Sequence, residues 1–360
     1  MRPPAQTPFT DVTVGALFDP NDRSDVFLVS SPKASMPTSL PVEAINPLLL
    51  VMSKHKIWRD GALVGWQDAT IHVMSHAVHY GSSVFEGIRC YSTPDGPAIF
   101  RLPEHMRRFQ DSCRIYRMPM RHSIEDLSAA CSEVVAENEL DACYLRPVAI
   151  RTGEEMGVLP NKAPVETFVI PWVWGRYLGH EALEEGVDVC VSSWRRPAPD
   201  TIPMLAKAGG NYLNSQLSKM EARASGFVEG IMLDTLGNVA EGSGENLFIV
   251  RDGVVYTPTI GSSILNGITR DSVMRIARDL GYTVLEQVVP RELLYISDEA
   301  FFTGTAAELT PIRSVDKIEV GPGKPGPVTL AIQKVYMGIA TGKMPDRYGW
   351  LTRVESRVTA

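Results

Sequence analysis

The chain contains 360 residues with a formal net charge of −7, and 44% of its residues are hydrophobic. This length allows a sizeable core and predicts two domains of a globular protein. The charge gives no broad basic field for nucleic acid, and no apolar run approaches the roughly 20 residues of a membrane span, so we expect neither as a partner.

Five cysteines are scattered along the chain, odd in number and without a CxxC pair: Cys90, Cys113, Cys131, Cys143 and Cys190. Such a set predicts free thiols in a reducing compartment rather than a disulfide framework. The first residues lack the basic, apolar and small order of a signal peptide and carry acidic side chains that transit peptides avoid. We therefore expect a cytoplasmic protein.

Residues 1–53 contain eight of the 26 prolines and show no sustained periodicity. This composition predicts an N-terminal extension that is partly disordered or lies on the surface. The folded part begins near Lys54, and two short strands then flank Asp60-Gly61, a dipeptide typical of a type I′ hairpin turn. A single strand is predicted over 84–91 (VFEGIRCY).

Two helices are predicted next. The first spans 104–117 and places Met106, Phe109 and Cys113 on one face. The second begins at Ser123, whose Ser-Ile-Glu-Asp sequence forms a capping box. Strands then follow at 143–150 and 166–174 and complete a smaller N-terminal α/β domain over 54–171.

Residues 172–181 are aromatic, contain glycine and show no periodicity, which predicts an interdomain loop. A larger domain follows over 182–360. Its clearest helix spans 268–280, where an apolar face reaches Leu280 and Gly281 ends the helix. Helices and strands mix without strict βαβ alternation, which indicates an α+β fold. The other predicted elements are helices at 211–224 and 328–340, and strands at 187–194, 227–234, 239–242, 246–250 and 254–258.

Three histidines, His72, His76 and His79, lie at i, i+4 and i+7, which is one face if the segment is helical. This spacing resembles a metal site. However, no acidic or cysteine ligand joins the histidines, and the HEXXH pattern is absent. We therefore predict no metal.

Lys207 has unusual neighbours for a lysine, because Leu205 and Ala206 precede it and the pair Gly209-Gly210 follows closely. The glycine pair lets a backbone or a ligand approach. An amine removed from water loses proton affinity and can act as a nucleophile toward a carbonyl. Taken alone, the pattern better fits a lysine at the edge of the core, with its charge paired or in water.

Longer motifs in the sequence favour a catalytic role for Lys207 over a structural one. The chain contains HVMSHAVHYGSSVFEGIRCY, YLRP, AKAGGNYL, EGSGENLF, GITRD and FFTGTAAELTPIRSVD. From about Lys56 to Val354 it thereby resembles the class IV aminotransferases, which use pyridoxal 5′-phosphate, and among them the branched-chain amino-acid aminotransferases. The resemblance implies fold type IV, with the active site between the two domains. It makes Lys207 the internal-aldimine lysine.

The resemblance also assigns the groups that hold the cofactor. Glu241 would keep the pyridine nitrogen protonated, and Tyr212 would donate to the phenolate oxygen. Free N–H groups at the start of a helix would bind the phosphate. The implied cofactor residues are Lys207, Arg108, Tyr212, Glu241, Leu265, Gly267, Ile268, Thr269 and Thr305.

Each of these assignments has a structural alternative. Glu241 and Glu245 also fit turn residues of a glycine-rich loop. Thr269 also fits a helix cap, and Arg108 a solvated side chain on a helix. Tyr212 also fits an ordinary tyrosine of an amphipathic helix.

The substrate pocket is implied by the same resemblance. Tyr144 and the N–H groups of Thr305 and Ala306 would hold the substrate α-carboxylate. Arg146 lies two residues beyond Tyr144, on the same strand face, and would meet the second carboxylate of glutamate. Any one of the aromatic residues alone also fits core packing. The implied substrate residues are Phe85, Tyr144, Arg146, Gly304, Thr305, Ala306, Trp174, Tyr177, Tyr80 and Val158.

Tyr80 and Val158 would reach the pocket from a facing subunit. This implies a homo-oligomer that is at least a dimer, and it leaves open a dimer or a hexamer. The segment before Val158 departs from the family pattern by its extra charges at Glu154 and Glu155, which bears on the shape of that loop.

The resemblance predicts a transferase that exchanges the amino group of L-leucine, L-isoleucine or L-valine with 2-oxoglutarate, giving branched-chain 2-oxo acids and L-glutamate. A D-amino-acid aminotransferase and an aminodeoxychorismate lyase would share the fold and the lysine, but the YLR and GTA signatures favour the branched-chain enzyme. A cofactor-free binding relative is the remaining alternative. The presence of both Lys207 and Glu241 argues against it.

Overall fold

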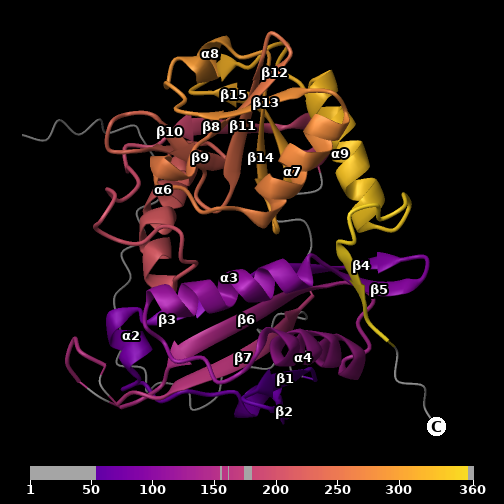
Figure 1. The fold of residues 1–360 in the computed structure, drawn as a ribbon. Helices are drawn as coiled ribbons and strands as arrows, with labels where there is room; N and C mark the ends of the chain where they lie inside the picture. The colour runs from indigo at the N-terminus through magenta and orange to yellow at the C-terminus, as the bar shows by residue number, and fades with distance from the viewer. Residues whose placement is uncertain (1–53, 155, 161, 174–180, 356–360) are drawn as a thin grey trace, which may run out of the picture. The chain divides into compact units, whose positions relative to one another are not determined.

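The structure is a computed structural model, and it describes residues 54–154, 156–160, 162–173 and 181–355. Its strands form two sheets, and helices pack against each of them (Figure 1). The mixture of helices with antiparallel and parallel strands confirms the predicted α+β fold. No helix in these residues is both long enough and apolar enough to cross a membrane.

The first sheet has the order β17-β5-β4-β6-β7-β1-β2, and β3 also pairs with β6. Two helices, α3 (Leu102–Ile115) and α4 (Ile124–Glu137), share one buried core with this sheet. Met106, Phe109 and Cys113 of α3 are buried there, as the sequence predicted. The strands are β1 (Lys56–Arg59), β2 (Ala62–Gly65), β3 (Ser83–Phe85), β4 (Ile88–Thr93), β5 (Gly96–Phe100), β6 (Cys143–Arg151), β7 (Val165–Trp172) and β17 (Leu351–Arg353).

The second sheet has the order β10-β9-β8-β15-β14-β11-β12-β13, with β16 beside β15. Its strands β8 and β15, β8 and β9, and β12 and β13 pair in parallel. The strands are β8 (Val187–Val191), β9 (Glu229–Leu233), β10 (Val239–Glu241), β11 (Asn246–Arg251), β12 (Val254–Pro258), β13 (Thr283–Gln287), β14 (Glu299–Gly304), β15 (Glu308–Val315) and β16 (Ile318–Glu319).

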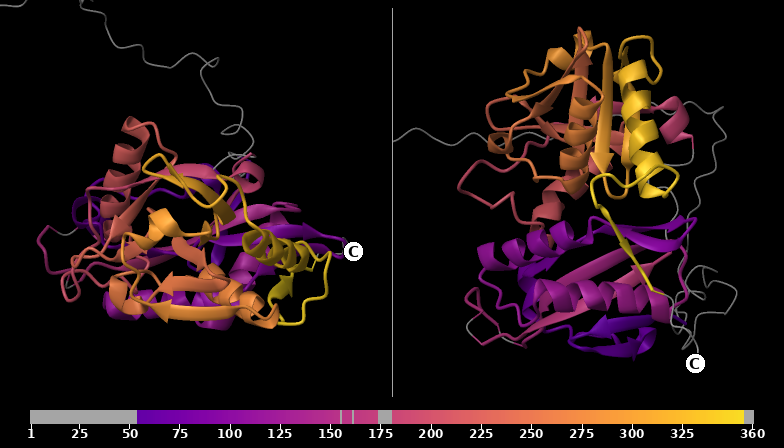
Figure 2. Two further views of the ribbon diagram at one scale, coloured as in Figure 1. Left: turned by 90° about the horizontal axis from the view of Figure 1, so that it is seen from above. Right: turned by 45° about the vertical axis from the view of Figure 1, so that its right-hand side comes forward.

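Helices α7 (Ile268–Asp279) and α9 (Pro327–Ala340) cover one face of the second sheet and bury Phe248, Ile276 and Tyr336 between them. After α9 the chain returns to the first sheet, where β17 pairs with β5 (Figure 2). The remaining helical segments are η2 (Trp66–Asp68), α2 (His76–Tyr80), α5 (Ala182–Glu185), η3 (Gly209–Asn211), α6 (Tyr212–Ala224), η4 (Ile260–Ser262) and α8 (Leu293–Ile296).

Local signals in the sequence located several of these elements correctly. Asp60 and Gly61 join β1 to β2 with φ values of 44° and 103°, the positive pair that a type I′ turn requires. Ser123 and Asp126 form both hydrogen bonds of the capping box that starts α4. All five cysteines are buried free thiols.

The single strand predicted over 84–91 is wrong, because Glu86 and Gly87 separate β3 from β4. The Glu86 carboxylate turns into the protein and is fully buried, where it accepts hydrogen bonds from His105 and Arg108 of α3. The register with β6 nevertheless continues across the break, and Glu86 N donates to Pro147 O at 2.8 Å, so the ladder is interrupted where Pro147 has no N–H to donate in return. Periodicity along the strand carried no sign of partners on a distant helix.

The three histidines do not share a helix face. Helix α2 begins at His76, so His72 lies in the turn before it. The ring of His76 is within hydrogen-bond distance of the Ser82 hydroxyl and the Gly157 carbonyl, which fix its orientation. Leu280 also differs from prediction, since it lies at the C-cap of α7 with 40% of its surface exposed.

Candidate active site

A cavity of about 360 Å³ receives side chains from both sheets and from α3 and α6. Nearly all the residues predicted for the cofactor and the substrate line it. The predicted residues at the cavity are Phe85, Arg108, Tyr144, Arg146, Lys207, Tyr212, Glu241, Leu265, Gly267, Ile268, Thr269, Gly304, Thr305 and Ala306.

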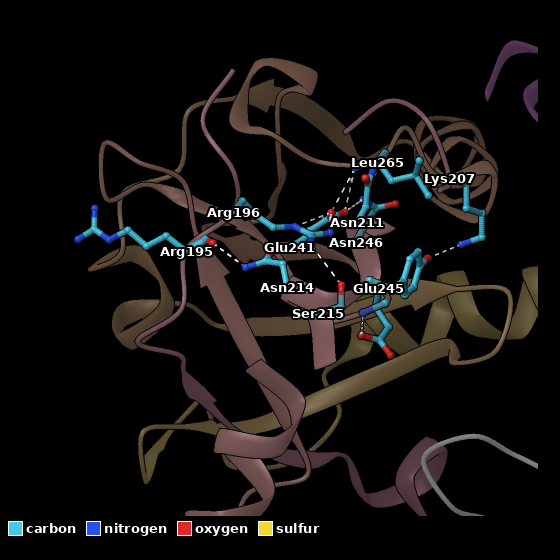
Figure 3. Close-up of polar contacts among 12 residues, drawn as sticks. Arg195, Arg196, Lys207, Asn211, Asn214, Ser215, Glu241, Glu245, Asn246 and Leu265 are labelled. Carbon is cyan, nitrogen blue, oxygen red and sulfur yellow. Dashed lines mark hydrogen bonds and ion pairs between the residues drawn. The ribbon is translucent and has the colours of Figure 1, made fainter. Parts of the chain in front are cut away.

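Lys207 is held at the cavity by its own backbone. Its carbonyl accepts from Phe85 N at 2.9 Å, and its N–H donates to the Ser112 hydroxyl at 3.0 Å. The lysine Nζ donates to the hydroxyl of Tyr212 at 2.5 Å (Figure 3). The same Nζ lies 4.9 Å from the centre of the Phe85 ring. The amine therefore lies between an aromatic ring and a phenol, whereas its sequence neighbour Leu205 is 48% exposed.

The glycine that follows Lys207 closely has a steric role. A Cβ at Gly209 would come within 2.4 Å of the Ser83 hydroxyl in β3. The neighbouring Ala208 bridges to Val84, so the lysine segment runs against the β3 backbone. A side chain at Gly209 would force the Ser83 side chain to move, whereas a Cβ at Gly210 would meet only the Gly81 carbonyl at 3.6 Å, an ordinary contact.

Glu241 lies at the other side of the cavity and is 2% exposed. Arg196 pairs with its Oε1, while Oε2 accepts from Asn246 Nδ2 at 3.0 Å and from Leu265 N at 3.1 Å (Figure 3). Burial raises the pKa of Glu241, and the Arg196 guanidinium opposes this effect. The carboxylate is thus a buried, fixed acceptor and not a solvated turn residue.

One end of the cavity is the N-terminus of α7, whose N-cap Gly267 makes no side-chain cap hydrogen bond. Thr269 lies inside the helix, so the capping role considered for it is wrong. Arg108 approaches this end from α3 and donates from Nη1 to the carbonyl of Asn266 at 3.0 Å. The first N–H groups of a helix have no acceptor within the helix, so they form an anion site together with the positive end of the helix dipole and the guanidinium of Arg108.

At the opposite end, Tyr144 and Arg146 project from β6 toward the turn after β14. Arg146 Nη2 donates to the Tyr144 hydroxyl at 3.3 Å. Its Nε–H is buried and has no hydrogen-bond partner within the part of the chain that the structure describes. Arg89 donates to the carbonyls of Thr305 and Ala306 at 3.3 and 3.2 Å, which leaves the N–H side of that turn to the cavity.

Two predicted substrate residues do not line this cavity. Tyr80 and Val158 are 41% and 82% exposed. The two belong to neighbouring segments, because the Tyr80 hydroxyl accepts from Gly157 N at 3.1 Å. Trp174 and Tyr177 lie outside the described residues.

Four residues at the site were missed as candidates: Glu86, Arg89, Arg196 and Asn246. Glu86 could have been noticed as an acidic residue within an apolar strand pattern, since a buried carboxylate needs a partner. Arg196 had no comparable signal, because its partner Glu241 lies 45 positions away.

These groups fit pyridoxal phosphate. An amine, a buried carboxylate, a phenol and an anion site surround one cavity, and the carboxylate is fixed by three different donors. The model of the class IV amino-transferase family matches residues 83–315, a range that includes all of these groups. The chain belongs to the class IV aminotransferases.

Comparison with individual proteins indicates to which group of class IV aminotransferases the chain belongs. The chain is 53% identical over 301 residues to the branched-chain-amino-acid aminotransferase of Salmonella typhimurium, covering 83% of this chain and 97% of that protein. The corresponding protein of Escherichia coli K12 is 53% identical over 299 residues, with the same coverage. The chain is therefore a branched-chain-amino-acid aminotransferase by family, as its motifs predicted.

Solved structures of branched-chain amino acid aminotransferases are also similar to this chain. A crystal structure of the Escherichia coli branched-chain amino acid aminotransferase has a TM-score of 0.82 at 53% identity, covering 84% of this chain and all of that chain. The Thermobaculum terrenum enzyme, in its pyridoxal phosphate form, has a TM-score of 0.80 at 35% identity, covering 84% of this chain and 99% of that chain. Fold type IV and the pyridoxal phosphate cofactor are thereby confirmed.

Proposed function

We propose that this site exchanges the amino group of L-leucine, L-isoleucine and L-valine with 2-oxoglutarate, and that Lys207 is the lysine that carries pyridoxal phosphate. The observation that supports it most is the meeting of Lys207 and the buried Glu241 in one cavity with an anion site at its end. Pyridoxal phosphate, when bound, supplies an electron-accepting ring that stabilises negative charge at the substrate Cα.

Lys207 and Glu241 have complementary tasks in this proposal. Nζ of Lys207 would take the proton from the substrate Cα and return one during the reverse transfer. Glu241 holds a proton on the ring nitrogen, because a buried carboxylate favours a cation beside it. Arg196 and Asn246 keep this carboxylate in place. Tyr212 donates toward the phenolate oxygen.

The two ends of the cavity orient the reactants. Arg108 and the N-terminal residues of α7, Gly267 to Thr269, take the phosphate. At the other end, the Tyr144 hydroxyl and the N–H groups of Thr305 and Ala306 hold the substrate α-carboxylate. Phe85 packs beside Tyr212, with ring centres 4.9 Å apart, and forms part of the apolar wall.

Arg146 would allow one pocket to accept both an apolar and a charged substrate side chain. Leucine presents an isobutyl group, whereas glutamate presents a second carboxylate that an apolar wall alone would reject. With leucine bound, the Arg146 guanidinium stays on the Tyr144 hydroxyl and over the Phe85 ring, 4.5 Å from its centre. With glutamate bound, its unsatisfied Nε–H reaches a charged acceptor.

A second copy of the chain completes the pocket in this proposal. Tyr80 and Val158 are exposed and apolar, and Leu159 next to Val158 is 68% exposed. Side chains of this kind gain stability when a partner covers them. We therefore infer a homo-oligomer, a dimer at least, in which these residues close the pocket of the facing subunit. The five buried thiols favour the cytoplasm as its location.

The two sheets suggest the same division into domains as the sequence: 54–171, an interdomain loop at 172–181, and 182–360. The exception is β17, which follows α9 in sequence but pairs with the first sheet. We propose that this return strand ties the two domains together.

Single-turnover spectroscopy of the purified holoenzyme tests the function. L-Leucine, L-isoleucine and L-valine should each remove the visible absorbance band, and 2-oxoglutarate should restore it. The D-enantiomers are the matched controls and should leave the band unchanged. A band removed by D-alanine and not by L-leucine would contradict the proposal.

A further inference from the structure

The break between β3 and β4 consists of Glu86 and Gly87, and both residues contact groups that line the active-site cavity. The backbone of the dipeptide stays beside β6, because β3 and β4 keep one register against β6 and Glu86 N donates to Pro147 O at 2.8 Å. This pairing does not depend on the Glu86 side chain or on the lack of a side chain at Gly87, so both features are available for another role.

The Glu86 carboxylate accepts two hydrogen bonds from one edge of the Arg108 guanidinium. Arg108 Nε donates to Oε1 at 2.7 Å and Nη2 donates to Oε2 at 2.8 Å, a two-bond fork that fixes the guanidinium plane. The remaining nitrogen, Nη1, is the one that faces the N-terminus of α7, where it donates to Asn266 O. The plane of Arg108 is therefore set by Glu86, and only one of its edges remains for an anion.

The Glu86 carboxylate is itself held without the help of Arg108. His105 Nδ1 lies 2.7 Å from Oε2, and Gly87 N donates to the same oxygen at 3.2 Å. Burial lowers the pKa of His105. As a neutral ring with its proton on Nδ1, the histidine donates to the carboxylate. Burial alone would raise the pKa of Glu86, but Arg108 and His105 more than offset this and hold that pKa well below its usual range.

Gly87 acts on the other end of the cavity. A Cβ at this position would lie 1.8 Å from the hydroxyl oxygen of Tyr144 and 2.6 Å from its Cζ. The ring would have to move, because no real Cβ contact is that short. The Tyr144 hydroxyl is also the group to which Arg146 donates, so the absence of a side chain at Gly87 sets the place of both.

We propose that Glu86 and Gly87 are a pair of positioning residues, in which Glu86 aims Arg108 at the cofactor phosphate and Gly87 makes room for Tyr144 at the substrate α-carboxylate. The proposal rests on the function proposed above. It predicts that the two neighbouring residues control separate steps, since each acts through a different side chain at a different end of the cavity.

The test of Glu86 is the equilibrium binding of pyridoxal phosphate and of phosphate-free pyridoxal to the apoprotein. Glu86→Gln should weaken pyridoxal phosphate binding by about 10- to 100-fold, the loss of a charged hydrogen bond, and change pyridoxal binding less than about threefold. Glu86→Asp keeps the charge and should lose part of the phosphate preference. Glu299→Gln is the matched control, since Glu299 is a buried carboxylate that holds Val328 N and Thr329 N outside the cavity.

The role of Gly87 is tested by measuring KM of the enzyme with pyridoxal phosphate bound. Gly87→Ala should raise KM for both leucine and glutamate about tenfold or more, as one displaced charged hydrogen bond does, and leave the ratio of pyridoxal phosphate to pyridoxal binding unchanged. Gly261→Ala is the matched control, because a Cβ there meets only ordinary contact at 3.6 Å.

Three results separate the proposals. Equal losses for pyridoxal and pyridoxal phosphate in Glu86→Gln would overturn the positioning role and leave Glu86 as a structural residue. An unchanged KM in Gly87→Ala would overturn the second half. A wild-type protein that binds both forms of the cofactor equally would instead contradict the proposed function itself.

Discussion

Replacing Arg146 by methionine tests how one cavity accepts leucine and glutamate in turn. Arg146 lines the cavity, and its buried Nε–H has no partner among the residues that the structure describes. A buried N–H without a partner has already lost its hydrogen bond to water, so a carboxylate that reaches it gains nearly the full free energy of a hydrogen bond. Leucine offers no such acceptor.

The magnitude follows from these contacts. A hydrogen bond to a charged group contributes about 1.5–3 kcal/mol, so Arg146→Met should slow the glutamate half-reaction by about 2–3 kcal/mol, roughly 30- to 150-fold. Methionine preserves an apolar contact with Phe85. The leucine half-reaction should therefore change less than about fivefold.

The assay is single-turnover loss of the visible band with each amino acid, at saturating and subsaturating concentrations. Arg146→Lys keeps a charge without the planar fork and should lose an intermediate amount with glutamate. Arg195→Met replaces an exposed arginine whose Nη1 donates to a backbone carbonyl, and it should change neither rate. Equal losses for both amino acids in Arg146→Met would refute the reasoning and make Arg146 part of the scaffold.

Three further variants test the site. Lys207→Ala should lower turnover about 10³-fold or more, because the proton-transfer group is lost, while the fold persists by circular dichroism; comparable turnover would remove Lys207 from the mechanism. Glu241→Gln should slow the leucine half-reaction about 100-fold and also lower the unfolding temperature, because it leaves Arg196 with a weaker partner in the interior; an unchanged single-turnover rate would contradict the role of Glu241. Burial, reinforced by Glu229, raises the pKa of Glu245 from 4.5 to about 8, so the folded protein keeps a proton that the unfolded chain releases and loses stability as pH rises across that window. Between pH 5 and pH 9 the free energy of unfolding of Glu245→Gln should therefore fall less than that of the wild type, by up to about 4 kcal/mol. Denaturant unfolding of the apoprotein at the two pH values measures this. A difference from wild type that is independent of pH would count against it.

Much of the fold was accessible from local signals. The hairpin at Asp60-Gly61, the capping box at Ser123 and the helix that ends before Gly281 each depend on residues within a few positions of one another. Such signals act through backbone conformation and short-range hydrogen bonds, and the sequence records both directly.

The rest of the site depends on partners far apart in the chain. Arg196 and Glu241 are 45 positions apart, and Glu86 and Arg108 are 22 apart. Periodicity could not predict which partners would stabilise the buried Glu86 carboxylate, because His105 and Arg108 lie on α3. The unsatisfied Nε–H of Arg146 is likewise a property of packing and appears in no pattern of residues.

The most direct test of the account is to locate the cofactor on the chain. Sodium borohydride fixes pyridoxal phosphate covalently to the lysine that carries it, and peptide mass spectrometry of the reduced holoenzyme then identifies that residue. We expect the added mass on Lys207 and its absence in Lys207→Ala. Stoichiometric label on another lysine of the wild-type protein, such as Lys219, would contradict it.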